Sequence, residues 1–312
     1  MNNIGNGRNG GERSMGDPAA FQAVSSLTVR VRRLVEGLLG GVHPSVHFGA
    51  SLEFAEHKKY NPGDDIRHVD WNALARTDRY FVKQQQREVI LNTLMVLDCS
   101  ASMGYRGSRA LADKLGYAVD LLAAAAYILV RQGDSAGMLT FGSAVGTYVP
   151  SGRRPDQLSL LMQRFARAVP ESGGRTDYVE AISKIASLSG QRTLILFATD
   201  LWGAPPETEA ALARLSAKGH DISVFHVLDP DELDLPFTQP VRLVGMENEG
   251  GWDVDPALIR EDYRAAAERF TARWRRVARE QGIDFVSATT DRPGAAVLTE
   301  FAAKRRGARR LR

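Results

Sequence analysis

From residue 94 onward, the chain alternates between short apolar runs and longer segments with helical periodicity. The apolar runs predict strands at 94–97, 137–141, 193–199, 222–228 and 283–288. The segments between them predict helices near 109–132, 155–168, 177–189, 206–218 and 256–281, and a last helix near 294–305. Unbroken apolar strands that alternate with helices are typical of a parallel sheet covered on both faces. The pattern therefore predicts an α/β fold with a mainly parallel sheet.

Three further segments complete the predicted organisation. Residues 1–17 are rich in Gly and Asn and predict a disordered N-terminus. A helix that stops at the Gly-Gly pair 40–41 and an unusual polar segment occupy 18–90, the α/β domain 91–305, and a basic tail 306–312. The short run TYVP at 147–150 predicts an edge strand that forms a hairpin with 137–141.

Composition narrows the class of protein. The net charge is only +3, and no aromatic residues interleave with the basic tail, so we do not expect nucleic acid as a partner. The N-terminus lacks the apolar run of a signal peptide, and no stretch approaches the roughly 18 apolar residues of a membrane-spanning helix. A single cysteine, Cys99, excludes an internal disulfide and is expected to be a small buried residue. We expect a cytoplasmic protein with no membrane segment.

Polar side chains follow two of the predicted strands. Asp98 ends the run LMVLD and is followed by Ser100 and Ser102, and Asp200 ends TLILFATD. Between them, the glycine loop SGGRTD carries Thr176 to the start of a predicted helix. Ligands of open parallel sheets bind outside the carboxyl ends of the strands. If the two strands are neighbours, these five side chains meet at one point.

The predicted constellation offers only oxygen ligands, two carboxylates and three hydroxyls. Hard oxygen donors suit magnesium or manganese (Mg²⁺ or Mn²⁺), whereas zinc and copper favour nitrogen or sulfur. Neutral hydroxyls neutralise such an ion poorly, so it has reason to accept a further carboxylate from a partner. The alternative is purely structural, with the strand reaching the surface at Asp98 and Thr176 capping a helix.

The segments DCSASMG, GGRTD and LFATD together resemble the metal-ion-dependent adhesion site (MIDAS) of von Willebrand factor A domains. The resemblance implies that Ser100, Ser102 and Thr176 coordinate the metal directly. It also implies that Asp98 and Asp200 lie behind these ligands or act through water. The sequence departs from the family pattern in having TDL in place of TDG after the later strand, and Asp177 is a candidate to replace or supplement Asp200.

A second stretch, KKYNPGDDIRHVDWNALART at 58–77, narrows the resemblance. It resembles the signature of bacterial domain-of-unknown-function family fifty-eight, whose members carry a von Willebrand A-like domain. The likeness continues through YFVKQQQREV to GIDFVSATTD and covers roughly residues 42–305. Relatives are commonly encoded beside MoxR-type AAA+ ATPases, so the resemblance implies such an ATPase, or its client, as a protein partner.

These observations predict a non-enzymatic, metal-dependent protein-binding module that acts in complex assembly or chaperone-like maturation. Trp202 and Asp177 are candidate partner contacts beside the predicted metal site. The alternative is a Mg²⁺-dependent phosphatase or other hydrolase that uses Asp98 as a nucleophile. Such enzymes usually need a second acid two residues later, where this chain has Ser100, and a lysine. Lys114 is predicted to be solvated, so the sequence favours binding over catalysis.

Overall fold

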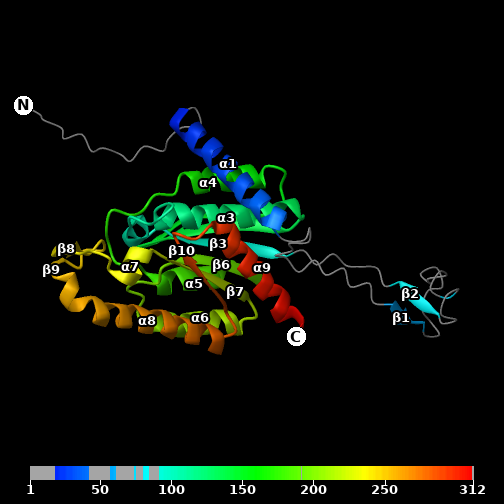
Figure 1. The fold of residues 1–312 in the computed structure, drawn as a ribbon. Coiled ribbons are helices and arrows are strands. Elements are labelled where there is room, and N and C mark those ends of the chain that lie inside the picture. Colours follow the sequence, from blue (N-terminus) through cyan, green and yellow to red (C-terminus); the bar gives the residue numbers. More distant parts are fainter. Residues whose placement is uncertain are drawn as a thin grey trace, which may run out of the picture. The chain divides into compact units, whose positions relative to one another are not determined.

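The computed structural model describes residues 18–41, 57–60, 74, 80–83, 91–190 and 192–310 (Figure 1). The chain divides into two compact units, one formed by 1–48 with 92–312 and the other by 49–91. The described part of the smaller unit contains an antiparallel pair, β1 (His57–Lys59) and β2 (Phe81–Lys83). The predicted disordered N-terminus and most of the segment 58–77 lie outside the described residues.

The larger unit is built on a six-stranded sheet with the order β10-β7-β6-β3-β4-β5. Its strands are β3 (Asn92–Asp98), β4 (Ser135–Phe141), β5 (Val145–Gly152), β6 (Thr193–Thr199), β7 (Asp221–Leu228) and β10 (Asp284–Thr289). Five strands run parallel, and β5 pairs with β4 in the opposite direction at the edge. The predicted strands and the edge hairpin are therefore confirmed.

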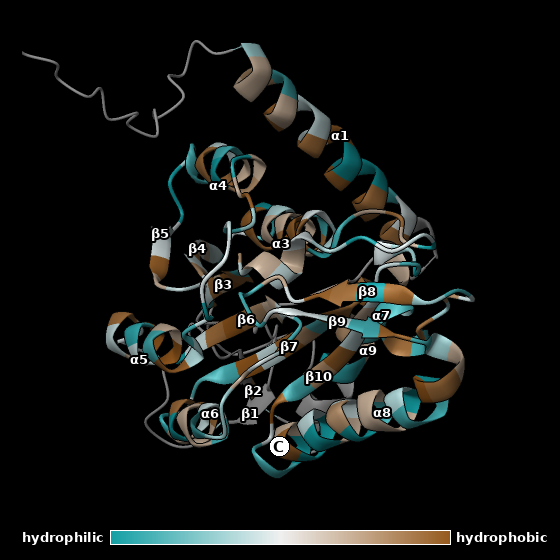
Figure 2. Cartoon of the chain, turned by 90° about the vertical axis from the view of Figure 1, so that its left-hand side faces the viewer, coloured by the Kyte–Doolittle hydropathy of each residue, from teal (hydrophilic) through white to brown (hydrophobic). Residues whose placement is uncertain are grey.

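Helices cover both faces of this sheet, as Figure 1 shows. On one face, α1 (Pro18–Gly41), α3 (Lys114–Arg131), α4 (Gln157–Ala166) and α9 (Gly294–Arg310) pack together. The other face carries α5 (Tyr178–Leu188), α6 (Glu207–Ala217) and α8 (Pro256–Glu280). Figure 2 shows the hydrophobic strands β3 and β6 between these two layers. The predicted fold class is confirmed, and α9 continues to Arg310, beyond its predicted end.

Alternate residues of each central strand pack into the apolar cores on opposite faces of the sheet. Leu94 and Val96 of β3 belong to the apolar cluster that includes side chains from α5, α6 and α8, such as Ile182, Leu215 and Trp274. The intervening Met95 and Leu97 are also fully buried, and they point to the opposite face because side chains alternate along a strand. Burial on both faces explains why the strands are continuous apolar runs.

The strand order places a topological switch point between β3 and β6. From β3 the chain proceeds through β4 and β5 to one edge, then returns to β6 and proceeds through β7 and β10 to the other. Leu97 of β3 pairs with Ala198 of β6, so the carboxyl ends of the two strands lie level. This position is where open parallel sheets bind ligands.

Four short elements of the larger unit were not predicted. They are the 3₁₀ turn η2 (Ala101–Gly104), the helix α7 (Pro230–Asp234), and the antiparallel hairpin of β8 (Val241–Val244) and β9 (Gly251–Val254). The hairpin strands remain outside the main sheet, so they lack the long apolar runs that mark the other strands. Among the described helices, none has the length and apolar character needed to cross a membrane.

Candidate metal-binding site

The hydroxyls predicted from the sequence lie at the switch point. Asp98 is the last residue of β3, and the turn that follows it carries Ser100 and Ser102. The Ser100 backbone N–H donates to Asp98 Oδ1 at 2.9 Å, which fixes the turn. Ser100 Oγ and Ser102 Oγ are 3.0 Å apart, within hydrogen-bonding distance. Thr176 is in the loop before α5, with its side chain almost completely buried.

A residue that the sequence analysis missed joins these two loops. Glu247, in the turn between β8 and β9, accepts hydrogen bonds through Oε1 from Ser102 Oγ at 3.2 Å and from Thr176 Oγ1 at 3.0 Å. Its Oε2 accepts from the Thr176 backbone N–H at 3.4 Å. Burial raises the pKa of Glu247, although the hydrogen bonds from Thr176 and Ser102 oppose the rise. No local motif marks this glutamate, which lies 71 residues from Thr176 in sequence.

Asp98 is fully buried and tightly held. Its Oδ2 accepts from Thr199 Oγ1 at 2.6 Å and from the Tyr178 hydroxyl at 3.2 Å. Burial, and then the charge of Asp200, raise the pKa of Asp98 to about 7 despite these hydrogen bonds. A negative charge at this position is therefore costly without a nearby cation. Tyr178, also missed from the sequence, connects the end of β3 to that of β6.

Asp200 is paired with a buried lysine. Lys114, the first residue of α3, lies with its Nζ 2.8 Å from Asp200 Oδ2 and 2.6 Å from Glu232 Oε1. The prediction that Lys114 is solvated was wrong, because its side chain has no exposed surface. Burial opposes its charge, but the charges of Asp200 and Glu232 outweigh that effect and raise the pKa of Lys114. Asp200 Oδ1 accepts from the Trp202 backbone N–H at 3.0 Å, so both its oxygens have donors.

The spacing of the oxygens fits a small hard cation. Six ligands about 2.0–2.1 Å from Mg²⁺ place neighbouring oxygens about 2.8–3.0 Å apart, whereas octahedral Ca²⁺ requires about 3.3–3.7 Å. The hydroxyl separation and the Glu247–Thr176 contact, both 3.0 Å, lie at the upper end of the Mg²⁺ range, whereas the Glu247–Ser102 contact at 3.2 Å lies between the two ranges. All three are also ordinary hydrogen-bond lengths. Within the described ranges, no group of three or more His, Cys, Asp or Glu is placed to hold a metal. A cation at the switch point would therefore depend on the hydroxyls.

The other predicted site residues flank this centre. Asp177 is exposed and caps α5, where its Oδ1 accepts from the Glu180 backbone N–H at 2.8 Å. Trp202 is half-buried and stacks on Phe270, with ring centroids 4.3 Å apart and an interplanar angle of 9°. Cys99 is buried as expected, and burial raises the pKa of its thiol to about 12. A role of Asp177 and Trp202 in partner binding stays a prediction.

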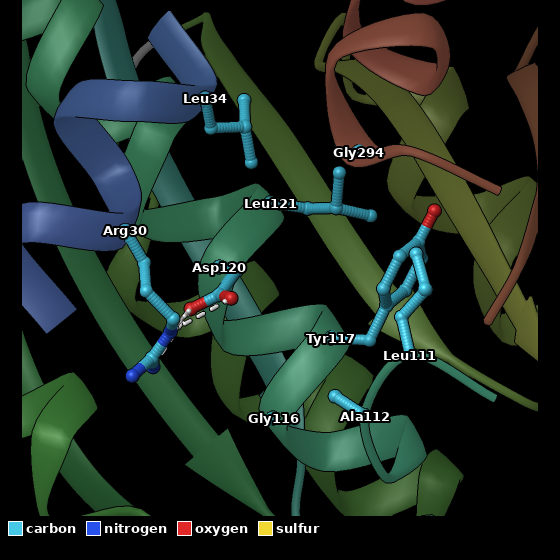
Figure 3. Close-up of a pocket in the computed structure, with 9 residues that line it drawn as sticks. All are labelled: Arg30, Leu34, Leu111, Ala112, Gly116, Tyr117, Asp120, Leu121 and Gly294. Atoms are coloured by element: carbon cyan, nitrogen blue, oxygen red, sulfur yellow. Dashed lines mark hydrogen bonds and ion pairs between the residues drawn. The ribbon is translucent and has the colours of Figure 1, made fainter. Parts of the chain in front are cut away.

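A separate cavity of about 420 Å³ lies among α1, α3 and the start of α9 (Figure 3). It is lined mostly by apolar side chains, including Leu34 and Leu121. The ion pair between Arg30 and Asp120 crosses one side of it, with Nη2 and Oδ1 2.9 Å apart. None of its lining residues is one of the three site hydroxyls, Ser100, Ser102 and Thr176. The cavity is therefore distinct from the candidate metal site.

Comparison with known proteins gives the family. Residues 56–273 match the family described as "Protein of unknown function DUF58". The chain belongs to this family. It is 32% identical over 296 residues to the uncharacterized protein Rv1480 of Mycobacterium tuberculosis, covering 93% of this chain and 91% of that protein. The uncharacterized protein Mb1516 of Mycobacterium bovis is similar to the same extent. The family resemblance that the signature segment suggested is confirmed.

Solved structures also resemble this DUF58 chain. The conserved hypothetical protein BatB from Bacteroides thetaiotaomicron is 18% identical, with a TM-score of 0.46 over 70% of this chain and 99% of its own. Proximal thread matrix protein 1 from the mussel byssus, solved with a zinc-occupied MIDAS motif, is 19% identical. Its TM-score is 0.34 over 45% of this chain and 38% of its own.

Proposed function

We propose that this DUF58 protein is a divalent-metal-dependent protein-binding module and not an enzyme. The observation that carries the proposal is a cluster of oxygens at the switch point of the sheet: the Ser102 and Thr176 hydroxyls, from two loops, both donate to Glu247 Oε1, and the Ser100 hydroxyl lies against that of Ser102. Their all-oxygen chemistry suits a hard cation such as Mg²⁺ or Mn²⁺, and the oxygens lie 3.0–3.2 Å apart, close enough to share one ion.

In this proposal, Ser100, Ser102 and Thr176 hold the ion through their hydroxyls. Asp98 and Asp200 lie behind these hydroxyls and supply negative charge from there or through water. The bound ion would supply a positive charge to which an acidic side chain of a protein partner can bind. Burial, and then the charge of Asp200, raise the Asp98 pKa, and a nearby cation would offset both effects by favouring the charged carboxylate.

The arrangement of Asp98 argues against the hydrolase alternative. A carboxylate that accepts a phosphoryl or acyl group must present a free oxygen to the substrate. Both oxygens of Asp98 accept hydrogen bonds, and the side chain has no exposed surface. The ammonium of Lys114 contacts the carboxylates of Asp200 and Glu232, so it is already paired.

The proposed partner is a MoxR-type AAA+ ATPase or its client. The resemblance to the family supports this partner, and the chemistry of the site adds that the contact would be a carboxylate. Trp202 and Asp177, which flank the site, are proposed to contact the same partner. The proposed role is complex assembly or chaperone-like maturation.

Metal binding is tested first by calorimetric titration of Mg²⁺ into the purified protein. Thr176→Ala and Ser102→Ala each remove one donor, and we expect each to weaken binding by about tenfold or more, as loss of metal-site residues generally does. Ser159→Ala removes an exposed hydroxyl of α4 and serves as the matched control. Equal affinity in all four proteins would contradict the site.

Partner binding is then measured with a purified MoxR-type ATPase in Mg²⁺ and in EDTA. We expect capture in Mg²⁺ that is lost in EDTA and in Thr176→Ala. If EDTA and the substitution leave capture unchanged, the metal does not bridge this protein to the ATPase.

A further inference from the structure

The turn between β8 and β9 is a well-defined structure. The backbone N–H of Gly245 donates to the Gly250 carbonyl at 2.7 Å and closes the turn. Within it, Asn248 adopts a left-handed conformation with φ of 69°. The Glu247 N–H donates to Glu249 Oε2 at 2.8 Å. These contacts orient Glu247 within the turn before it meets the hydroxyls.

The loop that carries Thr176 accommodates this turn through a glycine, since a Cβ placed on Gly173 would lie 3.2 Å from Asn248 Nδ2. Met246 lies beside the loop that carries Ser102, because a Cβ placed on Gly104 would be in van der Waals contact with Met246 Cε at 3.7 Å. Each of three consecutive turn residues, Met246, Glu247 and Asn248, therefore lies against a loop that carries Ser102 or Thr176. The turn as a whole packs against these loops, so the position of Glu247 does not depend on its own side chain alone.

The position of Glu247 has a consequence for the metal site. Its Oε1 lies 3.2 Å from Ser102 Oγ and 3.0 Å from Thr176 Oγ1. Neighbouring ligands of one Mg²⁺ are about 2.8–3.0 Å apart, so the Thr176 distance lies within that range and the Ser102 distance exceeds it by 0.2 Å. The oxygen is therefore close enough to both hydroxyls to share a cation with them after a small shift. A carboxylate is also the ligand that three neutral hydroxyls need, because it adds the charge that they lack.

We propose that Glu247 is a ligand that the chain supplies to its own metal site. The turn thereby occupies the coordination position that the carboxylate of a partner would take, and the partner binds by displacing Glu247. This inference rests on the proposed function and deepens it, since it makes the resting site self-occupied. Partner binding would release the turn of the β8–β9 hairpin from the two loops.

The test uses Mn²⁺ as the probe and counts its bound waters by water-proton relaxation and electron paramagnetic resonance. Glu247→Gln keeps the size of the side chain and removes its charge. At saturating Mn²⁺, we expect this variant to hold one more water than the wild type and to bind the ion about tenfold or more weakly. Asp253→Asn removes an exposed carboxylate of the same hairpin and should match the wild type.

A second arm of the experiment adds acetate as a free carboxylate. In Glu247→Gln, acetate should displace the additional water in a saturable manner, whereas the wild type should require at least tenfold more acetate. Equal water counts, Mn²⁺ affinities and acetate responses in the two proteins would overturn the inference while leaving the metal site intact. Failure of the wild type itself to bind Mn²⁺ would overturn both this inference and the proposed function.

Discussion

Replacing Asp98 by asparagine should stabilise the metal-free protein above neutral pH. The substitution removes a charge from a fully buried position and nearly keeps the shape of the side chain. The asparagine oxygen can accept from the Ser100 N–H, as Asp98 Oδ1 does. Its amide can donate to the hydroxyl oxygens of Thr199 and Tyr178, which now donate to Oδ2. No buried polar group is therefore left without a partner.

The magnitude follows from the pKa of Asp98, which burial and the charge of Asp200 raise from 3.8 to about 7. The folded protein then binds this proton more tightly than the unfolded chain does. Its free energy of unfolding falls as pH rises from about 4 to about 7 and changes no further above that. At 1.36 kcal/mol per pH unit, the loss is on the order of 4 kcal/mol. Asparagine has no such proton to lose.

The assay is urea unfolding of wild type and Asp98→Asn in EDTA, from about pH 5 to pH 8.5. The variant should be the more stable by about 1.5 kcal/mol near pH 5, and this difference should grow to about 4 kcal/mol near pH 8. Added Mg²⁺ should recover the stability of the wild type at pH 8 and have little effect on the variant. Parallel pH profiles of the two proteins would refute the reasoning, since Asp98 would then carry no raised pKa.

Two further substitutions test the surroundings of the site, and a third tests the ion pair between α1 and α3. Lys114→Met leaves two carboxylates without their cation and should lower the free energy of unfolding by about 3–5 kcal/mol; a urea midpoint close to that of the wild type would contradict the buried ion pairs. Gly173→Ala places a side chain at φ of +133° and against Asn248, so it should cost about 1–3 kcal/mol in thermal unfolding; an unchanged melting temperature would mean that this loop relaxes freely. Arg30→Ala breaks a pair whose arginine side chain is 48% exposed, and it should change the unfolding free energy by no more than about 1 kcal/mol. A larger change by chemical denaturation would show that α1 depends on this pair.

The sheet was predictable because its signals are local. Strands buried on both faces appear as apolar runs, so the predicted 193–199 coincides with β6 (Thr193–Thr199). The helices between strands were equally clear from their periodicity. By contrast, each strand of the β8–β9 hairpin has only four residues, and its residues are exposed or partly exposed. A short, half-exposed hairpin leaves no run long enough to distinguish it from a loop.

The candidate site was predictable only in part, for a related reason. Ser100 and Ser102 lie beside Asp98 in sequence, and Thr176 and Asp200 mark a helix start and a strand end, so ordinary patterns locate them. Glu247 reaches the same point from a separate hairpin, and nothing local distinguishes it from other surface acids. Lys114 was misassigned because periodicity cannot show that two carboxylates from distant segments, at Asp200 and Glu232, surround its ammonium. Long-range ion pairs require the fold.

The most direct test of the central claim is anomalous diffraction from crystals of the protein soaked in Mn²⁺. We predict one strong peak about 2.1–2.3 Å from the hydroxyl oxygens of Ser100, Ser102 and Thr176, with a carboxylate oxygen of Glu247 at the same distance. Absence of a peak at these hydroxyls under saturating Mn²⁺, or a peak confined to surface carboxylates elsewhere, would contradict the account.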